Sequence, residues 1–280
     1  MTRIGLVTTV HGRHRHLRAQ LAHLRRQAQP PDAHVVVAMG DPEVEQVVAE
    51  GAPSATTLHL PLADRELPLA AARNLGAATV LERGADVVVL LDVDCLPAPQ
   101  LLARYAEVAR PTRRAHLWSG VVHYLDPLAE GRTAYDDSDL ARSRPHPARP
   151  APAPGQVVHG ADLRLFWSLS FAIDRGSWQQ VGGFDEAYTG YGGEDTDLAW
   201  RVRALGGGMT WAGGAVAYHQ HHPTNRPPVQ HAASIVRNAN LFHERWGEFP
   251  MLGWLLEMQR LGAVRLDAGR NRWVLAEAPR

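Results

Sequence analysis

The residues Asp86-Val87-Val88-Val89-Leu90-Leu91-Asp92-Val93-Asp94 decide the fold. Their short, continuous run of valine and leucine is typical of a strand that is buried on both faces of a parallel sheet. It is the strongest strand signal in the chain, and two carboxylates follow it directly. Because active sites in parallel α/β sheets lie beyond the carboxyl ends of the strands, acidic side chains are expected at such a site here.

Strand-like and helix-like segments alternate on both sides of this stretch. Apolar runs predict strands at 4–9, 34–39, 56–60, 167–173 and 209–218. Helical spacing of apolar residues predicts helices at 16–27, 69–81, 194–205, 229–246 and 251–261, and a hairpin is expected at 263–275. This order predicts an α/β fold with a mostly parallel central sheet flanked by helices.

The length of 280 residues suits one large domain with an appendage. We expect a single domain at 1–262, with a first half at about 1–125 and a second half at about 161–248, followed by a C-terminal hairpin and tail at 263–280. Residues 126–160 contain many prolines and few large apolar side chains, which predicts a mobile insertion. Whether the insertion is a lid over the site or a linker stays open.

Charge and cysteine content exclude several classes of protein. The 29 basic side chains, all arginine, balance 29 acidic ones, so there is no global reason to bind nucleic acid. No apolar run is long enough to span a membrane, although peripheral contact with one stays open. The single Cys95 cannot form an internal disulfide, which indicates a reducing, cytoplasmic compartment. The oligomeric state is left open.

The pair Asp92 and Asp94 has the spacing of a metal site. Carboxylates two residues apart at the end of a strand point to one side, roughly 6–7 Å apart. They could share one Mn²⁺ or Mg²⁺ ion, which take oxygen ligands and keep positions open for phosphate. The alternative is that the two acids only cap the end of a strand or the start of a helix.

Three acids lie together in Gly192-Gly193-Glu194-Asp195-Thr196-Asp197, at the start of a predicted helix. Acidic residues are favoured in a first helical turn on electrostatic grounds alone. However, three in four residues behind paired glycines exceed what a cap needs. One of them could act as a general base toward an acceptor hydroxyl.

Two further clusters are weaker signals. The segment Tyr218-His219-Gln220-His221-His222 follows a strand, and one imidazole there could complete the metal shell. With 15 histidines in the chain, chance clustering is the alternative, and no role is assigned to the other two. Arg73 and Asn74 could hold a nucleotide, but without further evidence a solvent-facing polar pair is the better explanation of them.

These motifs together resemble the family 2 glycosyltransferases. The C-terminal part is similar to the group of chondroitin polymerase, polypeptide N-acetylgalactosaminyltransferase and β-1,4-galactosyltransferase. The resemblance covers about 4–222, and its specific part runs from Phe166-Trp167-Ser168 through Val181-Gly182-Gly183-Phe184-Asp185-Glu186 to Tyr188–Arg201. The family's donor half is matched by Ala72-Arg73-Asn74 together with Leu91-Asp92-Val93-Asp94. Its metal-histidine segment is matched by Ala217-Tyr218-His219-Gln220. The resemblance implies the A-type glycosyltransferase fold.

The resemblance also implies a role for each motif. Asp195 would be the catalytic base and Glu194 would orient the acceptor. The metal would be bound by Asp94 and His219, with Asp92 facing the metal or the ribose. The expected donor-binding residues are Thr9, His11, Asp41, Arg73, Asn74 and Asp92. The aromatic residues Tyr191 and Trp167 would contact the acceptor.

The function expected from these roles is inverting, metal-dependent transfer of a sugar. The donor would be a nucleotide-diphosphate sugar, with UDP-sugar as the expected case, and the acceptor a hydroxyl of a glycan or small molecule. The sequence departs from the family at the ends of the first two strands, which read Thr9-Val10-His11-Gly12 and Ala38-Met39-Gly40-Asp41. Two alternatives stay open: a sugar-1-phosphate nucleotidyltransferase, and a non-catalytic protein that binds sugar nucleotides or glycans.

Overall fold

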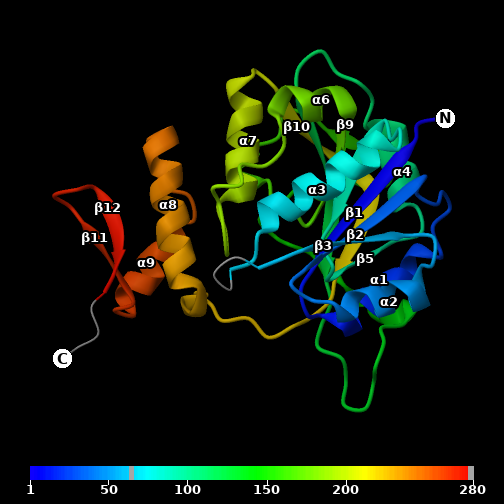
Figure 1. Ribbon diagram of the computed structural model, residues 1–280, viewed down its shortest axis with the longest axis horizontal. Helices are drawn as coiled ribbons and strands as arrows, with labels where there is room; N and C mark the ends of the chain where they lie inside the picture. The colour runs from blue at the N-terminus through cyan, green and yellow to red at the C-terminus, as the bar shows by residue number, and fades with distance from the viewer. Residues whose placement is uncertain (63–65, 277–280) are drawn as a thin grey trace.

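A twisted central sheet flanked by helices forms the body of the computed structural model, which describes residues 1–62 and 66–276 (Figure 1). The strand order in this sheet is β3-β2-β1-β4-β9-β6-β10-β5. Its strands are β1 (Ile4–Val10), β2 (Ala33–Met39), β3 (Thr56–Leu60), β4 (Val87–Leu91), β5 (Cys95–Pro97), β6 (His116–Tyr124), β9 (Ser170–Asp174) and β10 (Gly208–His219). Six strands run in one direction, while β9 and the short β5 run against their neighbours. The predicted α/β class with a mostly parallel sheet is confirmed.

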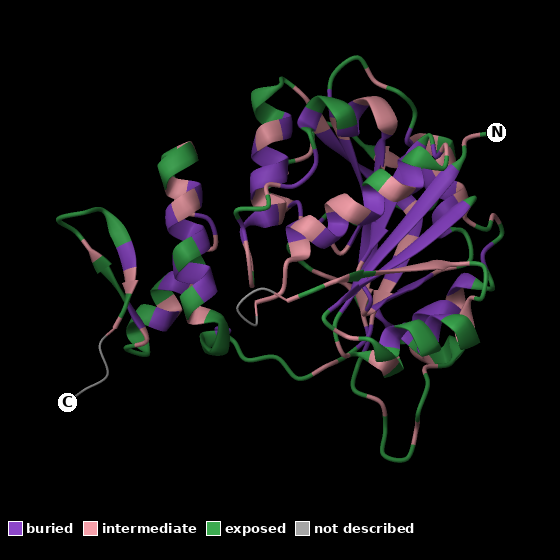
Figure 2. Ribbon diagram, in the orientation of Figure 1, coloured by how far each residue is buried: buried purple, intermediate pink, exposed green. Residues whose placement is uncertain are grey.

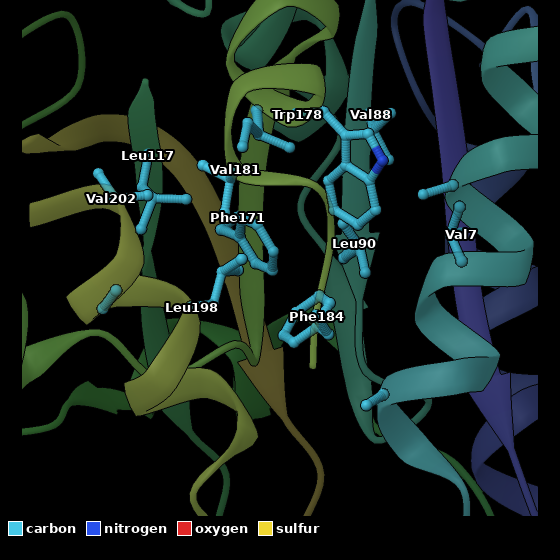
Figure 3. Close-up of a cluster of buried hydrophobic side chains, with 14 of the residues drawn as sticks. Val7, Val88, Leu90, Leu117, Phe171, Trp178, Val181, Phe184, Leu198 and Val202 are labelled. Atoms are coloured by element: carbon cyan, nitrogen blue, oxygen red, sulfur yellow. The ribbon is translucent and has the colours of Figure 1, made fainter. Parts of the chain in front are cut away.

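Helices cover both faces of the sheet. They are α1 (His14–Leu24), α2 (Glu43–Gly51), α3 (Leu69–Glu82), α4 (Leu101–Val108), α6 (Arg175–Val181) and α7 (Glu194–Ala204). The strand alternation decides which layer each side chain joins. Val88 and Leu90 of β4 pack in one core with Phe171, whereas Val87 and Val89 pack in the core on the opposite face. Figure 3 shows the first of these cores, between the sheet and the helices α3, α6 and α7.

The Pro-rich segment 126–160 is attached to the sheet by short elements. The strand β7 (Arg144–Pro145) pairs with β6, and β8 (Val157–Val158) pairs with β10. The helix α5 (Asp137–Arg142) begins with a capping box formed by Asp136 and Asp139. Arg149 is buried in this segment, with its guanidinium between the indoles of Trp167 and Trp211.

The C-terminal elements form a unit with its own small core, to one side of the body in Figure 1. They are α8 (Ala232–Trp246), α9 (Leu252–Arg260) and the hairpin β11 (Val264–Asp267) with β12 (Arg272–Leu275), after the short 3-10 helix η2 (Val229–His231). Another 3-10 helix, η1 (Leu163–Leu165), precedes β9. The hairpin residues Val264 and Trp273 pack with Leu255 of α9 and Ile235 of α8. The hairpin expected as an appendage therefore groups with α8 and α9, and the end of the expected tail, 277–280, lies outside the described residues.

Two differences from the sequence expectations concern element boundaries. The strand predicted at 167–173 begins only at Ser170, because Ser168 and Leu169 lie in a turn. The helix predicted at 229–246 is divided into η2 and α8. Within the described ranges, no helix combines the length and hydropathy needed to cross a bilayer.

Candidate functional site

The turn after β4 carries Asp92 and Asp94 and is held by the backbone of its neighbours. Gln20 of α1 donates through Nε2 to the carbonyl oxygens of Asp92 and Cys95, at 2.7 and 2.9 Å. The amide of Gln220, at the end of β10, donates to the carbonyl oxygen of Asp94 at 2.7 Å. These bonds fix the turn from two sides, so the two carboxylates project from the carboxyl edge of the sheet.

Asp94, His219 and His222 form a cluster in which one ligand atom of each lies within 4.8 Å of the others. Oδ2 of Asp94 is 3.6 Å from Nε2 of His219 and 3.3 Å from Nε2 of His222. His219 is the last residue of β10 and His222 lies three residues beyond it, and their rings are tilted against each other with centroids 5.2 Å apart. Arg13 contributes a cation on the same oxygen of Asp94, at 3.5 Å.

The charge state of this cluster suits a cation. Burial would raise the pKa of Asp94, but the hydrogen bond from His222 and the charges of His219 and Arg13 lower the pKa below its usual value. Burial lowers the pKa of His219, which favours the neutral imidazole. An ionised carboxylate and neutral imidazoles are the forms in which these side chains bind metals.

Asp92 faces a different partner. Arg73 of α3 donates through Nη2 to Oδ1 of Asp92 at 3.2 Å and through Nη1 to Oε1 of Glu194 at 2.9 Å. Arg73 is buried and also lies over the ring of Phe184. It therefore ties the turn after β4 to the start of α7. Asp92 is not one of the three clustered residues, and its expected contacts with the donor or the metal stay predictions.

Asp195 is placed at the N-terminus of α7 with a strongly perturbed pKa. Burial, and next the neighbouring charge of Glu194, raise the pKa of Asp195 to about 7, against the opposing effect of Arg73. The carboxylate accepts a hydrogen bond through Oδ1 from the amide of Thr196 at 2.7 Å. A carboxyl group that gains and loses its proton near neutral pH is suited to general-base work.

The expected donor-side residues of the first two strands meet at one loop. Asp41 accepts hydrogen bonds through Oδ2 from the amide of Gly12 at 2.7 Å and from His14 at 2.8 Å. His11 pairs through Nδ1 with the carbonyl of Met39 at 2.7 Å. Thr9 is buried at the end of β1. These contacts join the ends of β1 and β2 and place Asp41 and His11 at the same edge as the carboxylates.

Asn74 has a different place from the one expected. Its amide donates to the carbonyl of Phe184 at 2.9 Å and to Glu186 at 2.8 Å, and its Oδ1 accepts from the Phe184 amide at 2.7 Å. All of these contacts hold the loop that leads to α7. The structure thus gives Asn74 a positioning role for that loop in place of the expected donor contact.

Aromatic side chains line the other side of the site. A series of rings leads from His219 through Tyr124, stacked at 5.0 Å, and through His146 to Trp167. Tyr191 is 39% exposed and stacks on His231 at 4.6 Å. Burial and then the charges of Asp195 and Glu194 raise the pKa of Tyr191, which places its hydroxyl near the acidic residues. The expected contacts of Trp167 and Tyr191 with an acceptor stay predictions.

Three residues of this site were missed from the sequence. His222 belongs to the metal-type cluster, and its spacing of three residues from His219 was the available signal. Arg13 and Arg149 had no signal, because their positions depend on contacts with Asp94 and with Trp167 and Trp211. Arg149 is brought in by the insertion, whose composition alone suggested no buried charge.

Comparisons with known proteins find glycosyltransferases that are similar to this chain. Residues 162–224 match the family described as the N-terminal domain of galactosyltransferase. The chain is 34% identical over 77 residues to validoxylamine A glucosyltransferase of Streptomyces hygroscopicus subsp. jinggangensis, covering 28% of this chain and 18% of that protein. It is 36% identical over 89 residues to N-acetylglucosaminyl-diphospho-decaprenol L-rhamnosyltransferase of Mycobacterium tuberculosis, covering 30% and 28%. The resemblance to the glycosyltransferases is confirmed.

A solved structure shares the glycosyltransferase fold. The crystal structure of GalNAc-T7 with UDP, GalNAc and Mn²⁺ superposes with a TM-score of 0.53 over 79% of this chain and 43% of that one, at 15% identity. This likeness extends from the segment 162–224 to 79% of the chain. The chain spans less than a third of the length of the two glycosyltransferases that it matches in sequence.

Proposed function

We propose that this protein transfers a sugar from a nucleotide-diphosphate donor to an acceptor hydroxyl, with inversion and with the help of a divalent metal. The observation that carries the proposal is the meeting of two sites at one sheet edge. One is the cluster of Asp94, His219 and His222, and the other is Asp195 at the start of α7. The bridge that Arg73 makes from Asp92 to Glu194 connects them.

The side chains of the cluster fit Mn²⁺ or Mg²⁺. One carboxylate oxygen and two imidazole nitrogens leave roughly three of six positions for phosphate oxygens and water. The two imidazoles favour Mn²⁺ over Mg²⁺, because Mg²⁺ prefers oxygen ligands. When bound, the metal would neutralise charge that develops on the leaving diphosphate.

The other steps of the proposed transfer are assigned to side chains of the protein. Arg73 holds Asp92 and Glu194 in fixed positions, so that the donor meets a preorganised edge. Asp195 takes the proton of the acceptor hydroxyl as that oxygen attacks the anomeric carbon from the face opposite the diphosphate. A single displacement with one base inverts the configuration, as in inverting glycosidases. UDP is the nucleotide we propose, and the cytoplasm, where the lone Cys95 would stay reduced, is the compartment.

Coupled binding of metal and nucleotide tests the proposal without an identified acceptor. The metal alone would find an incomplete set of ligands, and the diphosphate alone would be repelled by the carboxylates of Asp92 and Asp94. Each ligand removes the unfavourable free energy that the other meets, so their binding should be positively coupled. A ligand at about 100 times its dissociation constant stabilises the fold by about 2.7 kcal/mol. We therefore expect a larger rise in Tm with UDP plus Mn²⁺ than the sum of the separate shifts.

Histidine variants make that test specific. His219→Ala and His222→Ala should each reduce the excess shift, whereas His221→Ala, a matched control on the same segment, should keep it because His221 is exposed and outside the cluster. Strictly additive shifts in the wild type would rule out a shared metal and diphosphate site. Release of UDP from a UDP-sugar that an acceptor accelerates would separate a transferase from a nucleotidyltransferase or a binding protein, neither of which predicts it.

A further inference from the structure

The helix α9 exposes leucine side chains on the face that points away from its core. Leu255 and Met258 point inward and are fully buried in the small C-terminal core. The outward face, at helical spacing from these, holds Leu252, Gly253, Leu256, Gln259 and Arg260, all of them exposed. A helix on a protein surface normally turns polar side chains to water, so an exposed outer face built on two leucines requires another explanation.

The neighbouring hairpin continues the apolar exposure. In the register of β11 with β12, Val264 lies opposite Leu275 and Leu266 opposite Trp273, so these four side chains share one face. Val264 and Trp273 are buried, while Leu266 and Leu275 are 39% and 49% exposed at the rim of that face. Leu261, in the turn between α9 and β11, is 64% exposed. We call Leu252, Leu256, Leu261, Leu266 and Leu275 the leucine surface.

This concentration is unlike the rest of the chain. The described residues include ten exposed large apolar side chains, and five of them are the leucine surface. The other five are scattered over the first 229 residues, as single exposed apolar side chains normally are. Figure 2 shows that the hairpin and much of α9 lie apart from the buried body of the protein. The five leucines lie within residues 252–275 of one unit, and such a concentration of exposed apolar side chains marks a candidate interaction region.

The charges around the leucines select the partner. Residues 251–276 contain Arg260, Arg265, Arg270 and Arg272 against Glu257 and Asp267, a net charge of +2 in a chain whose total is zero. Arg272 pairs with Glu244 of α8 at 3.4 Å, and the other three arginines are exposed. A second copy of the chain would bring the same excess of positive charge against itself, whereas an anionic bilayer offers both an apolar layer and negative headgroups.

We propose that the leucine surface docks this protein on an anionic lipid bilayer, with the leucines at the headgroup boundary and the arginines among the phosphates. The docked face is connected to the candidate site. Trp254, on the inner side of α9, stacks against Tyr191 with ring centroids 5.8 Å apart. Membrane contact would thus hold the aromatic side of the site near the lipid surface. The inference does not depend on the proposed transfer reaction.

Sedimentation with lipid vesicles tests the docking. The full-length protein should sediment with vesicles of phosphatidylglycerol and phosphatidylcholine in equal parts, and much less with phosphatidylcholine alone. Leu252→Ser with Leu256→Ser should lower the vesicle partition coefficient roughly tenfold or more, since each leucine loses its apolar burial. Arg260→Gln with Arg265→Gln should also weaken binding and reduce its sensitivity to salt. Leu205→Ser is the matched control, because Leu205 is 45% exposed just after α7 and outside the leucine surface.

A labelled variant tests the same contact without removing it. The only cysteine, Cys95, is buried, so a Leu256→Cys variant can be labelled selectively with a fluorophore that responds to polarity. The label should brighten and shift to the blue on addition of the anionic vesicles, while the same label at Leu205→Cys should not change.

Three results would overturn the proposal. These are no sedimentation of the wild type with anionic vesicles, equal binding by the Leu252→Ser/Leu256→Ser variant, and a label at position 256 that does not respond. Light scattering after gel filtration decides what covers the leucines in that case. A dimer that the leucine substitutions dissociate would assign the face to a second copy of the chain.

Discussion

Asp195 is the residue whose replacement separates chemistry from binding. Asn keeps the shape of the side chain but cannot take a proton, so Asp195→Asn should lower sugar transfer about 10²–10⁴-fold. Binding of UDP with Mn²⁺, measured by calorimetry, should change little because other side chains hold the donor. Near wild-type transfer would leave Asp195 as a helix cap and direct attention to Glu194.

The raised pKa of Asp195 also predicts how rate and stability depend on pH. The base must be ionised, so transfer by the wild type should rise as pH increases through about 7 and then level off. The folded pKa lies above the ordinary aspartate value of about 3.9, so the folded state holds the proton more tightly. The stability that this proton contributes is complete below about pH 4 and is lost as pH rises through 7. Asp195→Asn should therefore raise Tm at pH 8 and leave it nearly unchanged at pH 4.

Arg73 is the residue on which the acidic side chains depend for stability. Arg73→Met would leave Asp92 and Glu194 without their buried cation, and removing one partner of a buried ion pair costs about 3–5 kcal/mol. Urea unfolding should show that loss. Arg18→Met is the control, since Arg18 makes an exposed pair with Glu50 at 4.0 Å, and surface pairs contribute only about 0–1 kcal/mol. Equal effects of the two substitutions would contradict the bridging role.

At the scale of elements, the insertion has one part that is tied down and one that is exposed. Ser143 and Arg149 are buried, whereas most of residues 126–134 are exposed, and the guanidinium of Arg149 is enclosed by two indoles. Limited digestion with a protease of broad specificity should cut first within 126–134, as mass spectrometry would show. Arg149→Ala should add early cuts in 144–158, whereas the exposed Arg142→Ala should not. First cuts in 144–158 of the wild type would contradict the anchoring.

The same digestion addresses the open question of a lid. Protection of 126–134 by UDP plus Mn²⁺ would indicate closure over the site, and unchanged cutting would leave the segment a linker. In the sequence, the prolines of this region predicted an irregular path, but not the burial of Arg149. That burial depends on Trp211, which lies 62 positions further along the chain.

Elements with a clear hydrophobic period were predictable, and those that depend on distant partners were not. The run Val87 to Leu91 predicted β4, and the spacing of the leucines predicted α1. Both could be predicted because the pattern of buried side chains is visible in neighbouring residues of the sequence. The helix α2 was missed although Val44, Val47 and Val48 have helical spacing, so a signal was present. The strand β6 was missed because Ser119 and Gly120 interrupt its apolar run. Gly120 is required there by packing, since a Cβ would lie 2.3 Å from the carbonyl oxygen of Ala215.

The candidate site shows the same limit. Asp94 and Asp195 could be found because acidic residues at the end of a strand and at the start of a helix form local patterns. The sequence could not show that His222, and not His221, lies beside Asp94. That depends on how the chain turns beyond β10 and brings the imidazole of His222 within 3.3 Å of Asp94. Asn74 was assigned to the donor for the same reason: nothing in its neighbourhood indicates that its amide binds the loop at 184–186.

At the scale of the whole molecule, a buried carboxylate of the body binds side chains of the C-terminal unit. Asp197 of α7 is fully buried, and its Oδ1 accepts hydrogen bonds from Arg245 at 2.8 Å and from Trp246 at 2.9 Å. Arg245 also pairs with Asp185, and Asn238 donates to the carbonyl of Gly192 at 2.7 Å, beside the candidate base. Thus α8 supplies charge and hydrogen bonds that the first turns of α7 need.

These contacts predict that the two parts do not unfold independently. A chain shortened after Pro228 would lose the bonds of Arg245 and Trp246 to Asp197 and the packing of Phe242 on Trp200 of α7, so the body should unfold at a lower urea concentration. Shortening after Leu261 removes only the hairpin and exposes part of the small core, so the sheet should keep nearly its full stability. Urea unfolding followed by far-ultraviolet circular dichroism measures both variants. If the chain that ends at Pro228 unfolds at the same urea concentration as the full chain, the C-terminal unit is a separate domain. If instead Arg245→Met alone reproduces most of the loss, the coupling runs through Asp197, and α8 belongs to the structure that holds the candidate base Asp195 in place.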